Sequence, residues 1–193
     1  MSTDSKRDRA VIAAADLFMR YGFARTTMGD IAKAADMSRP ALYLLFPGKE
    51  EVFEAAVLYL NDGRSDEFRA AIEALDNLRD RLFIICERWL VNVYELRTTV
   101  PDAGDMDDLA FPVVRKVYAD LQALLAEVIV RSGVFERAGA GGIRATPLQI
   151  ARNLVFGIRG LGAPATNIDD MREMTLLQID LLCAALERSP ASA

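Results

Sequence analysis

Residues 26–43 read TTMGDIAKAADMSRPALY. The stretch predicts two short helices joined by a tight turn, because each helix can begin at a residue whose side chain caps a helix N-terminus. Thr26 or Thr27 is expected to cap the first helix, and Ser38 the second. Asp36 stands in the turn, where its short polar side chain tolerates the left-handed backbone conformation that a tight turn requires. This is the pattern of a helix-turn-helix.

Helical periodicity continues on both sides of this stretch. The helices that it predicts lie at about 6–21, 28–35, 39–45, 49 into the seventies with a bend near Gly63, 77–98, 113–132, 147–161 and 168–187. One further short helix is expected in the connector at 99–112. We find no convincing alternation of apolar and polar residues that would predict a strand. The fold class is therefore all-α with about nine helices: a three-helix, helix-turn-helix head at 1–48 and a helical body at 49–193.

The stretch resembles the signature of the tetracycline-repressor (TetR) family of transcriptional regulators. In that signature a Thr-Thr pair precedes Ile-Ala, Ala-Gly-Val-Ser, Leu-Tyr, a Phe and Lys-Glu. The matching positions are Thr26-Thr27, Ile31-Ala32, Ala35 to Ser38, Leu42-Tyr43, Phe46 and Lys49-Glu50. The resemblance covers about 10–55, and the rest of the chain agrees in the number and order of helices. The departures are Asp36 in place of a glycine, Pro40 in place of a small residue, and Leu44 and Leu45 where many relatives contact DNA.

The resemblance implies a homodimeric regulator, expected to be a repressor, that binds a palindromic operator in double-stranded DNA. It also implies a small hydrophobic or amphipathic effector that releases the protein from DNA. The DNA-contacting residues that it implies are Thr27, Ser38, Arg39, Pro40, Ala41, Tyr43 and Lys49. Arg39 is the one long basic side chain of the second helix and is expected to contact base edges. Lys6, Arg7 and Arg9 are expected to form an arm that reaches toward the DNA.

The charge distribution agrees with a nucleic-acid-binding N-terminus. The net charge is −5 overall, but residues 1–49 hold eight Lys or Arg and five Asp, for a net charge of +3. The remaining residues therefore carry −8. A basic end on an acidic body indicates that the two parts of the chain have different partners.

The body is expected to hold the effector and to form the dimer. The candidate effector-contacting residues, on the three middle helices and the connector, are Trp89, Asn92, Phe111, Tyr118, Gln122 and Phe156. The last helix has two apolar stripes, which indicates burial on both sides. The stripe assigned to the dimer interface is Leu176, Ile179, Cys183 and Leu186, and the opposite stripe is Met174, Leu177, Leu181 and Ala185. Which stripe meets a partner is open at this point.

Two ion pairs are hypothesised between the last two predicted helices. In an antiparallel pair, Arg159 would face Glu173 and Arg152 would face Asp180, because both pairs have the same index sum. The alternatives are chance spacing and a partner across the dimer interface.

Other function classes have little support in the sequence. The chain has no His, and its two Cys lie in apolar helical patterns that favour burial over a disulfide. We therefore expect no catalytic residue, no metal and no cofactor. Because no apolar stretch reaches the ~18–20 residues of a membrane span and no signal peptide is evident, we expect a cytoplasmic protein without a membrane partner. The remaining alternatives are a helical adaptor module, which would lack salt-dependent DNA binding, and a small-molecule enzyme, which would turn its ligand over.

Overall fold

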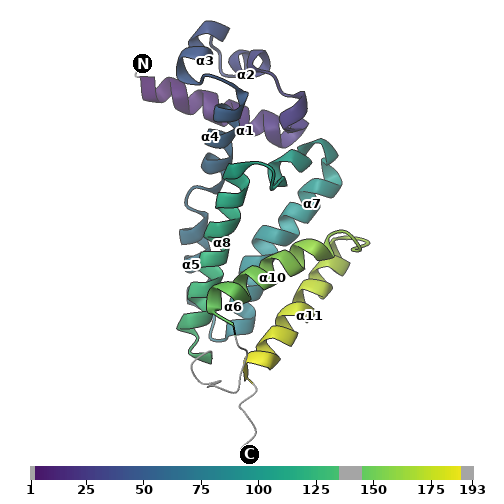
Figure 1. Cartoon of the computed structure of the whole chain (residues 1–193). Coiled ribbons are helices and arrows are strands. Elements are labelled where there is room, and N and C mark those ends of the chain that lie inside the picture. Colours follow the sequence, from purple (N-terminus) through teal and green to yellow (C-terminus); the bar gives the residue numbers. More distant parts are fainter. Residues whose placement is uncertain (1–2, 135–144, 188–193) are drawn as a thin grey trace, which may run out of the picture. The chain divides into compact units, whose positions relative to one another are not determined.

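The computed structural model describes residues 3–134 and 145–187. Within these ranges the secondary structure is helical and holds no strand, which confirms the predicted all-α class (Figure 1). The helices are α1 (Thr3–Arg25), α2 (Met28–Ala34), α3 (Arg39–Leu45), α4 (Lys49–Asn61), α5 (Arg64–Glu73), α6 (Leu78–Cys86), α7 (Asn92–Thr99), α8 (Pro112–Arg131), α10 (Pro147–Leu161) and α11 (Ile168–Glu187). A π-helical turn, η1 (Glu87–Val91), joins α6 to α7, and a 3₁₀-helix, η2 (Pro101–Asp107), precedes α8. With α6, η1 and α7 counted as one helix, the described ranges hold nine α-helices.

The chain divides into two compact units. Unit 1 comprises Met1–Asp62 and Leu96–Val117, and unit 2 comprises Gly63–Glu95 and Tyr118–Ala193. This division differs from the head and body expected at 1–48 and 49–193, because α4 and η2 group with the N-terminal helices. None of the described helices is long and apolar enough to cross a membrane.

An aromatic cluster forms the centre of unit 1 and explains why α4 belongs to it. The ring of Phe53 on α4 lies 5.2 Å from that of Phe18 and 4.9 Å from that of Phe23, both on α1. Phe111 completes the cluster, with its ring centroid 4.6 Å from that of Phe53. Such edge-to-face and tilted aromatic contacts add to the gain from burying the rings. Phe111 is half-buried and packs on this cluster in unit 1, which does not support its assignment to the effector pocket.

Gly22 interrupts α1 and makes room for η2. Its φ of 72° and ψ of 170° are non-helical, and the helix resumes to end at Arg25, four residues beyond the end expected at 21. An added Cβ at Gly22 would overlap the carbonyl oxygen of Asp102 and lie 2.7 Å from its carbonyl carbon. Next to this contact, the amide of Ala24 donates to the Asp105 carboxylate at 3.0 Å, and Arg25 pairs with Asp102 at 2.6 Å. Only glycine allows this approach.

The long helix expected at 77–98 contains the π-helical turn η1, and the turn changes which residues face inward. The amide of Asn92 donates to the carbonyl of Glu87, five residues earlier, where an α-helix would use the residue four earlier. Four residues at helical spacing are buried: Leu78, Leu82, Ile85 and Trp89. Asn92, the next position of that spacing, is exposed, and its side chain donates to the Arg88 carbonyl at 3.0 Å. Asn92, which was predicted as an effector contact, therefore does not share this buried face, because the π-helical turn breaks the period of 3.6 residues.

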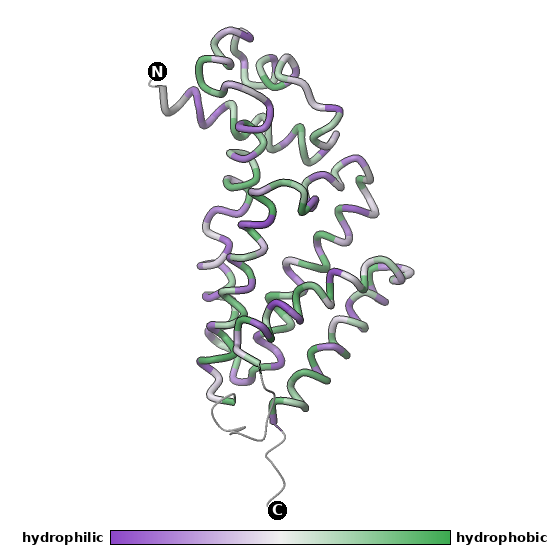
Figure 2. The backbone as a smooth tube through the Cα atoms, viewed as in Figure 1, coloured by the Kyte–Doolittle hydropathy of each residue, from purple (hydrophilic) through white to green (hydrophobic). Residues whose placement is uncertain are grey.

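The helices α10 and α11 pack against each other in unit 2. A capping box begins α10: the Gln149 amide donates to the Thr146 hydroxyl at 3.2 Å, and the Thr146 amide donates to the Gln149 side chain at 2.8 Å. Residues 181–186 of α11 are all hydrophobic, and the tube is mostly green near the end of this helix (Figure 2). The buried residues of α11 are Met171, Thr175, Ile179, Cys183 and Leu186.

The buried face of α11 corrects the predicted dimer interface. Ile179, Cys183 and Leu186 are at most 8% exposed within a single chain, and Leu176 is half-buried. The assigned interface therefore packs on its own subunit, and its prediction as a partner surface is wrong. Leu177 and Leu181 of the opposite stripe are 60% and 64% exposed. The two stripes were recognised correctly, but the sequence gives no means of telling which one faces inward.

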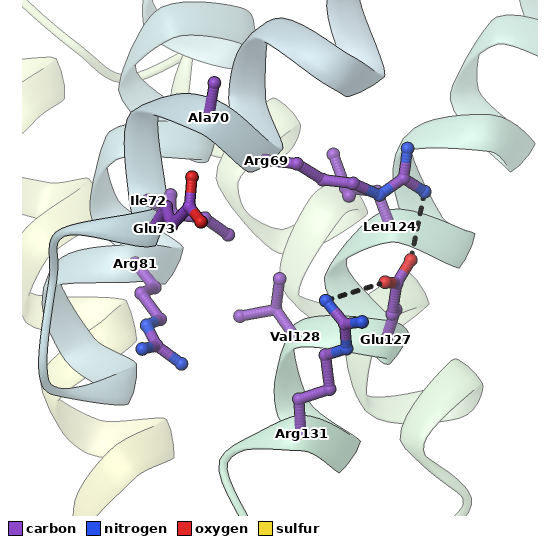
Figure 3. Close-up of a pocket in the computed structure, with 9 residues that line it drawn as sticks. All are labelled: Arg69, Ala70, Ile72, Glu73, Arg81, Leu124, Glu127, Val128 and Arg131. Atoms are coloured by element: carbon purple, nitrogen blue, oxygen red, sulfur yellow. Dashed lines mark hydrogen bonds and ion pairs between the residues drawn. The ribbon is translucent and has the colours of Figure 1, made fainter.

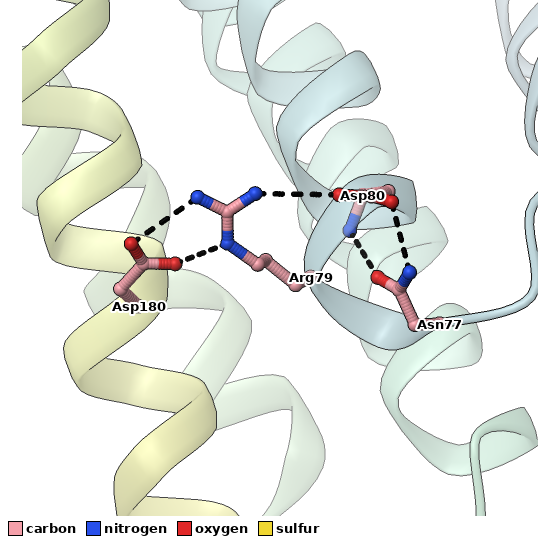
Figure 4. Close-up of polar contacts among 4 residues, drawn as sticks. All are labelled: Asn77, Arg79, Asp80 and Asp180. Atoms are coloured by element: carbon pink, nitrogen blue, oxygen red, sulfur yellow. Dashed lines mark hydrogen bonds and ion pairs between the residues drawn. The ribbon is translucent and has the colours of Figure 1, made fainter.

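Asp180 pairs with α6 and not with α10. Its carboxylate binds the guanidinium of Arg79, which also pairs with Asp80 at 3.4 Å (Figure 4). Asn77 supports the same turn, because its side chain accepts from the Asp80 amide at 2.8 Å. The hypothesised pair between Arg152 and Asp180 is therefore wrong.

Candidate functional site

The helix-turn-helix lies where the sequence predicts it, with Thr27 as the first cap. The Thr27 hydroxyl accepts from the Asp30 amide at 3.2 Å and donates to the Asp30 carboxylate at 2.6 Å. The Thr27 amide donates to the same carboxylate at 3.0 Å and completes a capping box. Because the Thr27 hydroxyl and amide both stabilise the carboxylate, the pKa of Asp30 is lowered. Thr26 is buried instead, and its hydroxyl donates to the Gly22 carbonyl at 2.8 Å.

The turn and the second helix also form as expected. Asp36 takes the left-handed conformation with a φ of 51°, and the Ser38 hydroxyl accepts from the Ala41 amide at 3.3 Å. Pro40 occupies the first turn of α3, where the missing N–H leaves no helix bond unmade. Ile31 of α2 and Leu42 of α3 are fully buried. The motif is thus fixed by caps at both helices and by an apolar contact layer.

The outer face of α3 presents most of the residues predicted to contact DNA. Ser38, Arg39 and Pro40 are exposed, and Ala41 is half-buried. Tyr43 is 52% exposed, so it is not a core residue. Leu44, at 88% exposure, is the most open large apolar side chain of the described residues. The face therefore combines short polar and apolar groups with one long cation.

Arg39 lies back against the first turn of α2. An added Cβ at Gly29 would overlap the Arg39 guanidinium and lie 2.6 Å from its Cζ atom. The positive charge of Arg39 also contributes to lowering the pKa of Asp30. The side chain is exposed and flexible, so its rotation away from Gly29 opens it toward a ligand without disturbing the core.

Two basic residues that were predicted to contact DNA, Lys49 and Arg7, also make contacts within the head. The Lys49 ammonium donates to the Phe23 carbonyl at 2.8 Å and lies 4.1 Å from the centre of the Phe23 ring. Arg7 donates to the Leu45 carbonyl at the end of α3 at 3.0 Å and stacks over the ring of Phe46. Arg7 is therefore part of the folded head, and its reach toward the DNA, together with Lys6 and Arg9, stays a prediction. Lys49 retains two donors for a phosphate.

The remaining predicted effector contacts take part in aromatic packing or are half-buried on their helices. Trp89 is buried against Phe68, with ring centroids 5.8 Å apart, and the Arg64 guanidinium lies 4.6 Å from the Trp89 ring. Tyr118 stacks on Phe156, with centroids 6.0 Å apart and planes 9° from parallel. Gln122 is half-buried on α8. Trp89 and Tyr118 each pack on another aromatic ring, as aromatic residues at helical spacing commonly do in a core.

A cavity of about 400 Å³ lies elsewhere in unit 2 (Figure 3). Residues of α5, α6 and α8 line it: Arg69, Ala70, Ile72, Glu73, Arg81, Leu124, Glu127, Val128 and Arg131. None of them was predicted, because the contacts join residues that are far apart in sequence. Arg69 pairs with Glu127 at 3.0 Å across 58 positions, and its hydrogen bond lowers the pKa of Glu127. Across 3–134 and 145–187, no three Cys, Asp or Glu side chains are grouped to hold a metal ion.

Comparison with known proteins identifies the helix-turn-helix segment. The family model described as bacterial regulatory proteins, tetR family, matches residues 11–56. This match contains α2, the turn and α3 in full. Residues 11–56 of the chain are therefore similar to the tetR family of bacterial regulatory proteins. The exposed face of α3 lies within this matched segment.

The likeness in fold to solved structures extends beyond the matched segment. A putative TetR-family transcriptional regulator from Rhodococcus sp. is 23% identical with a TM-score of 0.63, over 94% of this chain and 100% of that chain. The fatty acid degradation regulator FadR from Bacillus halodurans is 16% identical with a TM-score of 0.66, over 97% and 100%. A putative transcriptional regulator from Saccharomonospora viridis in complex with choline is 20% identical with a TM-score of 0.62, over 92% and 97%. At these identities the likeness establishes the fold of the whole chain.

Proposed function

We propose that this protein is a ligand-responsive transcriptional regulator that binds a palindromic DNA operator as a homodimer. The observation that carries the proposal is the capped helix-turn-helix within the segment similar to the tetR family, with the first turn of α3 exposed. A helix of this kind contacts base edges with its N-terminal residues, where short side chains let the backbone approach the DNA. Ser38, Pro40 and Ala41 provide those short side chains.

The DNA contacts divide into phosphate contacts and base contacts. Tyr43 and Lys49 have donors that suit phosphate oxygens, and Thr27 and Ser38 lie at the starts of α2 and α3. Arg39 carries the base contact, because a guanidinium can bind the O6 and N7 atoms of guanine with two hydrogen bonds. On this proposal Arg39 leaves Gly29 when the head binds DNA.

A second copy of the chain is needed because one head contacts too few base pairs for specificity. Two heads that enter successive major grooves lie about 34–36 Å apart, and a dimer interface has to fix that distance. The face proposed for that interface is the exposed apolar stripe of α11, Leu177 and Leu181, together with Leu148 and Phe156 of α10. All four are between 37% and 64% exposed in the single chain. A second copy would remove this apolar surface from water.

Effector control requires a ligand that binds better to the DNA-incompetent state than to the DNA-binding state. The cavity in unit 2 is a site for such a ligand. Its wall includes α5, which follows α4 along the chain after the break at Gly63. Among the solved relatives, one is described as a fatty acid degradation regulator and another is in complex with choline, so the fold alone does not set the ligand class.

The test is selection of bound duplexes from a random-sequence pool, with wild type, Arg39→Ala and Arg20→Ala in parallel. Arg20 is the matched control, because it is an exposed arginine of the same head that pairs with Asp16 at 2.9 Å. We expect an enriched palindrome, relaxed by Arg39→Ala at one position in each half-site and unchanged by Arg20→Ala. Binding should weaken steeply with salt. No enrichment at low salt would refute a DNA-binding function and favour an adaptor.

A further inference from the structure

We propose that the cavity between α5, α6 and α8 binds an anionic amphiphile, with a carboxylate or phosphate head and an alkyl tail. This rests on the proposed function, because it names the ligand class of the effector. Figure 3 shows the lining side chains: arginines from all three helices surround the apolar residues. The inference follows from the charge of the rim, the chemistry of the wall and the position of one carboxylate.

The rim carries a net positive charge. Three arginines (Arg69, Arg81 and Arg131) stand against two glutamates (Glu73 and Glu127), which leaves one unit of positive charge. Such a rim attracts an anion and repels a cation of the choline type. The described structure therefore favours an anionic ligand over a cationic one.

Arg81 is the best-placed anchor for the head group. Its Nε donates to the Leu75 carbonyl at 2.8 Å, which holds the guanidinium in place. Within the part of the chain that the structure describes, no carboxylate pairs with Arg81, so its two terminal nitrogens are available. A held guanidinium with two open donors suits bidentate binding of a carboxylate or phosphate.

The wall of the cavity suits an alkyl chain. Ile72, Leu124 and Val128 line it, and each is at most 8% exposed. A volume of about 400 Å³ lies within the range of small-molecule sites. Each added CH₂ group that enters the cavity should tighten binding by about fourfold.

Glu127 competes with the ligand for the other two arginines. Its carboxylate pairs with Arg69 at 3.0 Å and with Arg131 at 3.4 Å (Figure 3). A bound anion therefore has to share these two arginines with the Glu127 carboxylate or displace it from them. Removing the Glu127 charge should therefore strengthen anion binding, whereas removing the Arg81 charge should weaken it. A purely structural role of these residues does not produce opposite effects.

Trp89 provides a readout that does not depend on DNA. It is the single Trp of the chain, and its ring packs against Phe68, which precedes Arg69 on the cavity wall. We would titrate the full-length protein with dodecanoate, dodecyl phosphate, dodecanol, dodecyltrimethylammonium and inorganic phosphate. Trp89 fluorescence would be followed and Kd confirmed by calorimetry. The proteins would be wild type, Arg81→Gln, Glu127→Gln and the control Arg79→Gln, which lies on the same helix outside the cavity.

We expect both anionic amphiphiles to bind at least tenfold more tightly than dodecanol or the cation, and inorganic phosphate alone to bind weakly. Arg81→Gln should weaken dodecanoate binding about tenfold or more, because a hydrogen-bonded charge is lost. Glu127→Gln should strengthen it severalfold, and Arg79→Gln should leave it within about twofold. Thermal unfolding of each variant checks that it is folded.

Equal binding of the cation and the anion, or an unchanged Kd in Arg81→Gln, would overturn the inference. An enriched palindrome without dodecanoate binding would leave the DNA-binding function in place and refute this ligand class. Dodecanoate binding that follows the expected variant pattern, without any DNA enrichment, would support the site and refute the regulator.

Discussion

Replacing Gly22 by alanine is expected to destabilise unit 1 far more than the same replacement at Gly63. The two glycines have nearly equal φ angles of 72° and 70°. An added Cβ at Gly63 meets no atom within 4 Å, whereas at Gly22 it overlaps the backbone carbonyl of Asp102. The comparison therefore separates the backbone cost of a positive φ from the cost of displacing η2.

The magnitudes follow from the contacts. Gly63→Ala places a side chain in the left-handed region and should cost about 1 kcal/mol. Gly22 has a ψ of 170°, a region that glycine alone occupies readily, so the backbone cost there is about 2 kcal/mol. Displacing η2 also breaks the bond from the Ala24 amide to Asp105, which is worth about 1.5 kcal/mol as a bond to a charged group. The exposed pair between Arg25 and Asp102 adds at most about 1 kcal/mol. We expect a total loss of about 4 kcal/mol.

The assay is equilibrium urea unfolding at one fixed protein concentration, because a dimer would make stability concentration-dependent. With an m-value of about 2 kcal/mol per molar, the Gly22→Ala midpoint should fall by about 2 M and the Gly63→Ala midpoint by about 0.5 M. The different backbone costs alone predict a difference of about 1 kcal/mol between the two variants. If Gly22→Ala loses no more than about 1 kcal/mol beyond Gly63→Ala, the close approach of η2 to α1 contributes nothing, and the reasoning from the Asp102 contact is refuted.

Three further predictions test other parts of the structure. Thr27→Ala should lower the free energy of unfolding by about 1 kcal/mol through loss of the cap, while Thr27→Ser should retain it; equal thermal midpoints for all three proteins would contradict the capping box. The hydrogen bond from Arg79 lowers the pKa of Asp180, so the ionised carboxylate stabilises the fold above the ordinary pKa of 3.8, and this contribution is lost as the pH falls below that value. Asp180→Asn should therefore flatten the acid side of a plot of unfolding free energy against pH. An unchanged plot would show that the pair contributes nothing. Burial raises the pKa of the Cys86 thiol to about 12 and that of Cys183 to about 11, so a thiol reagent at pH 8 should label both slowly until urea unfolds the protein; rapid labelling of native Cys183→Ser, which retains only Cys86, would argue against burial of that thiol.

The head could be predicted from the sequence because its decisive interactions are local. Thr27 with Asp30 and Ser38 with Ala41 are pairs three positions apart, and Asp36 sets the turn between them. Caps and turns depend on neighbours that stay close whatever the rest of the chain does. The two apolar stripes of α11 were visible for the same reason.

Tertiary packing alone decided which stripe of α11 is buried, which partner Asp180 takes and where the cavity lies. Arg79 and Asp180 are 101 positions apart, and Arg7 contacts the Leu45 carbonyl across 38. These contacts depend on how whole helices rotate and approach one another, and the π-helical turn before Asn92 changes that rotation within a single helix. Sequence periodicity gives the faces of each helix, whereas packing selects which faces meet. The sequence by itself therefore determined the all-α class and the helix-turn-helix, and the tertiary structure decided the contacts among the helices of each unit.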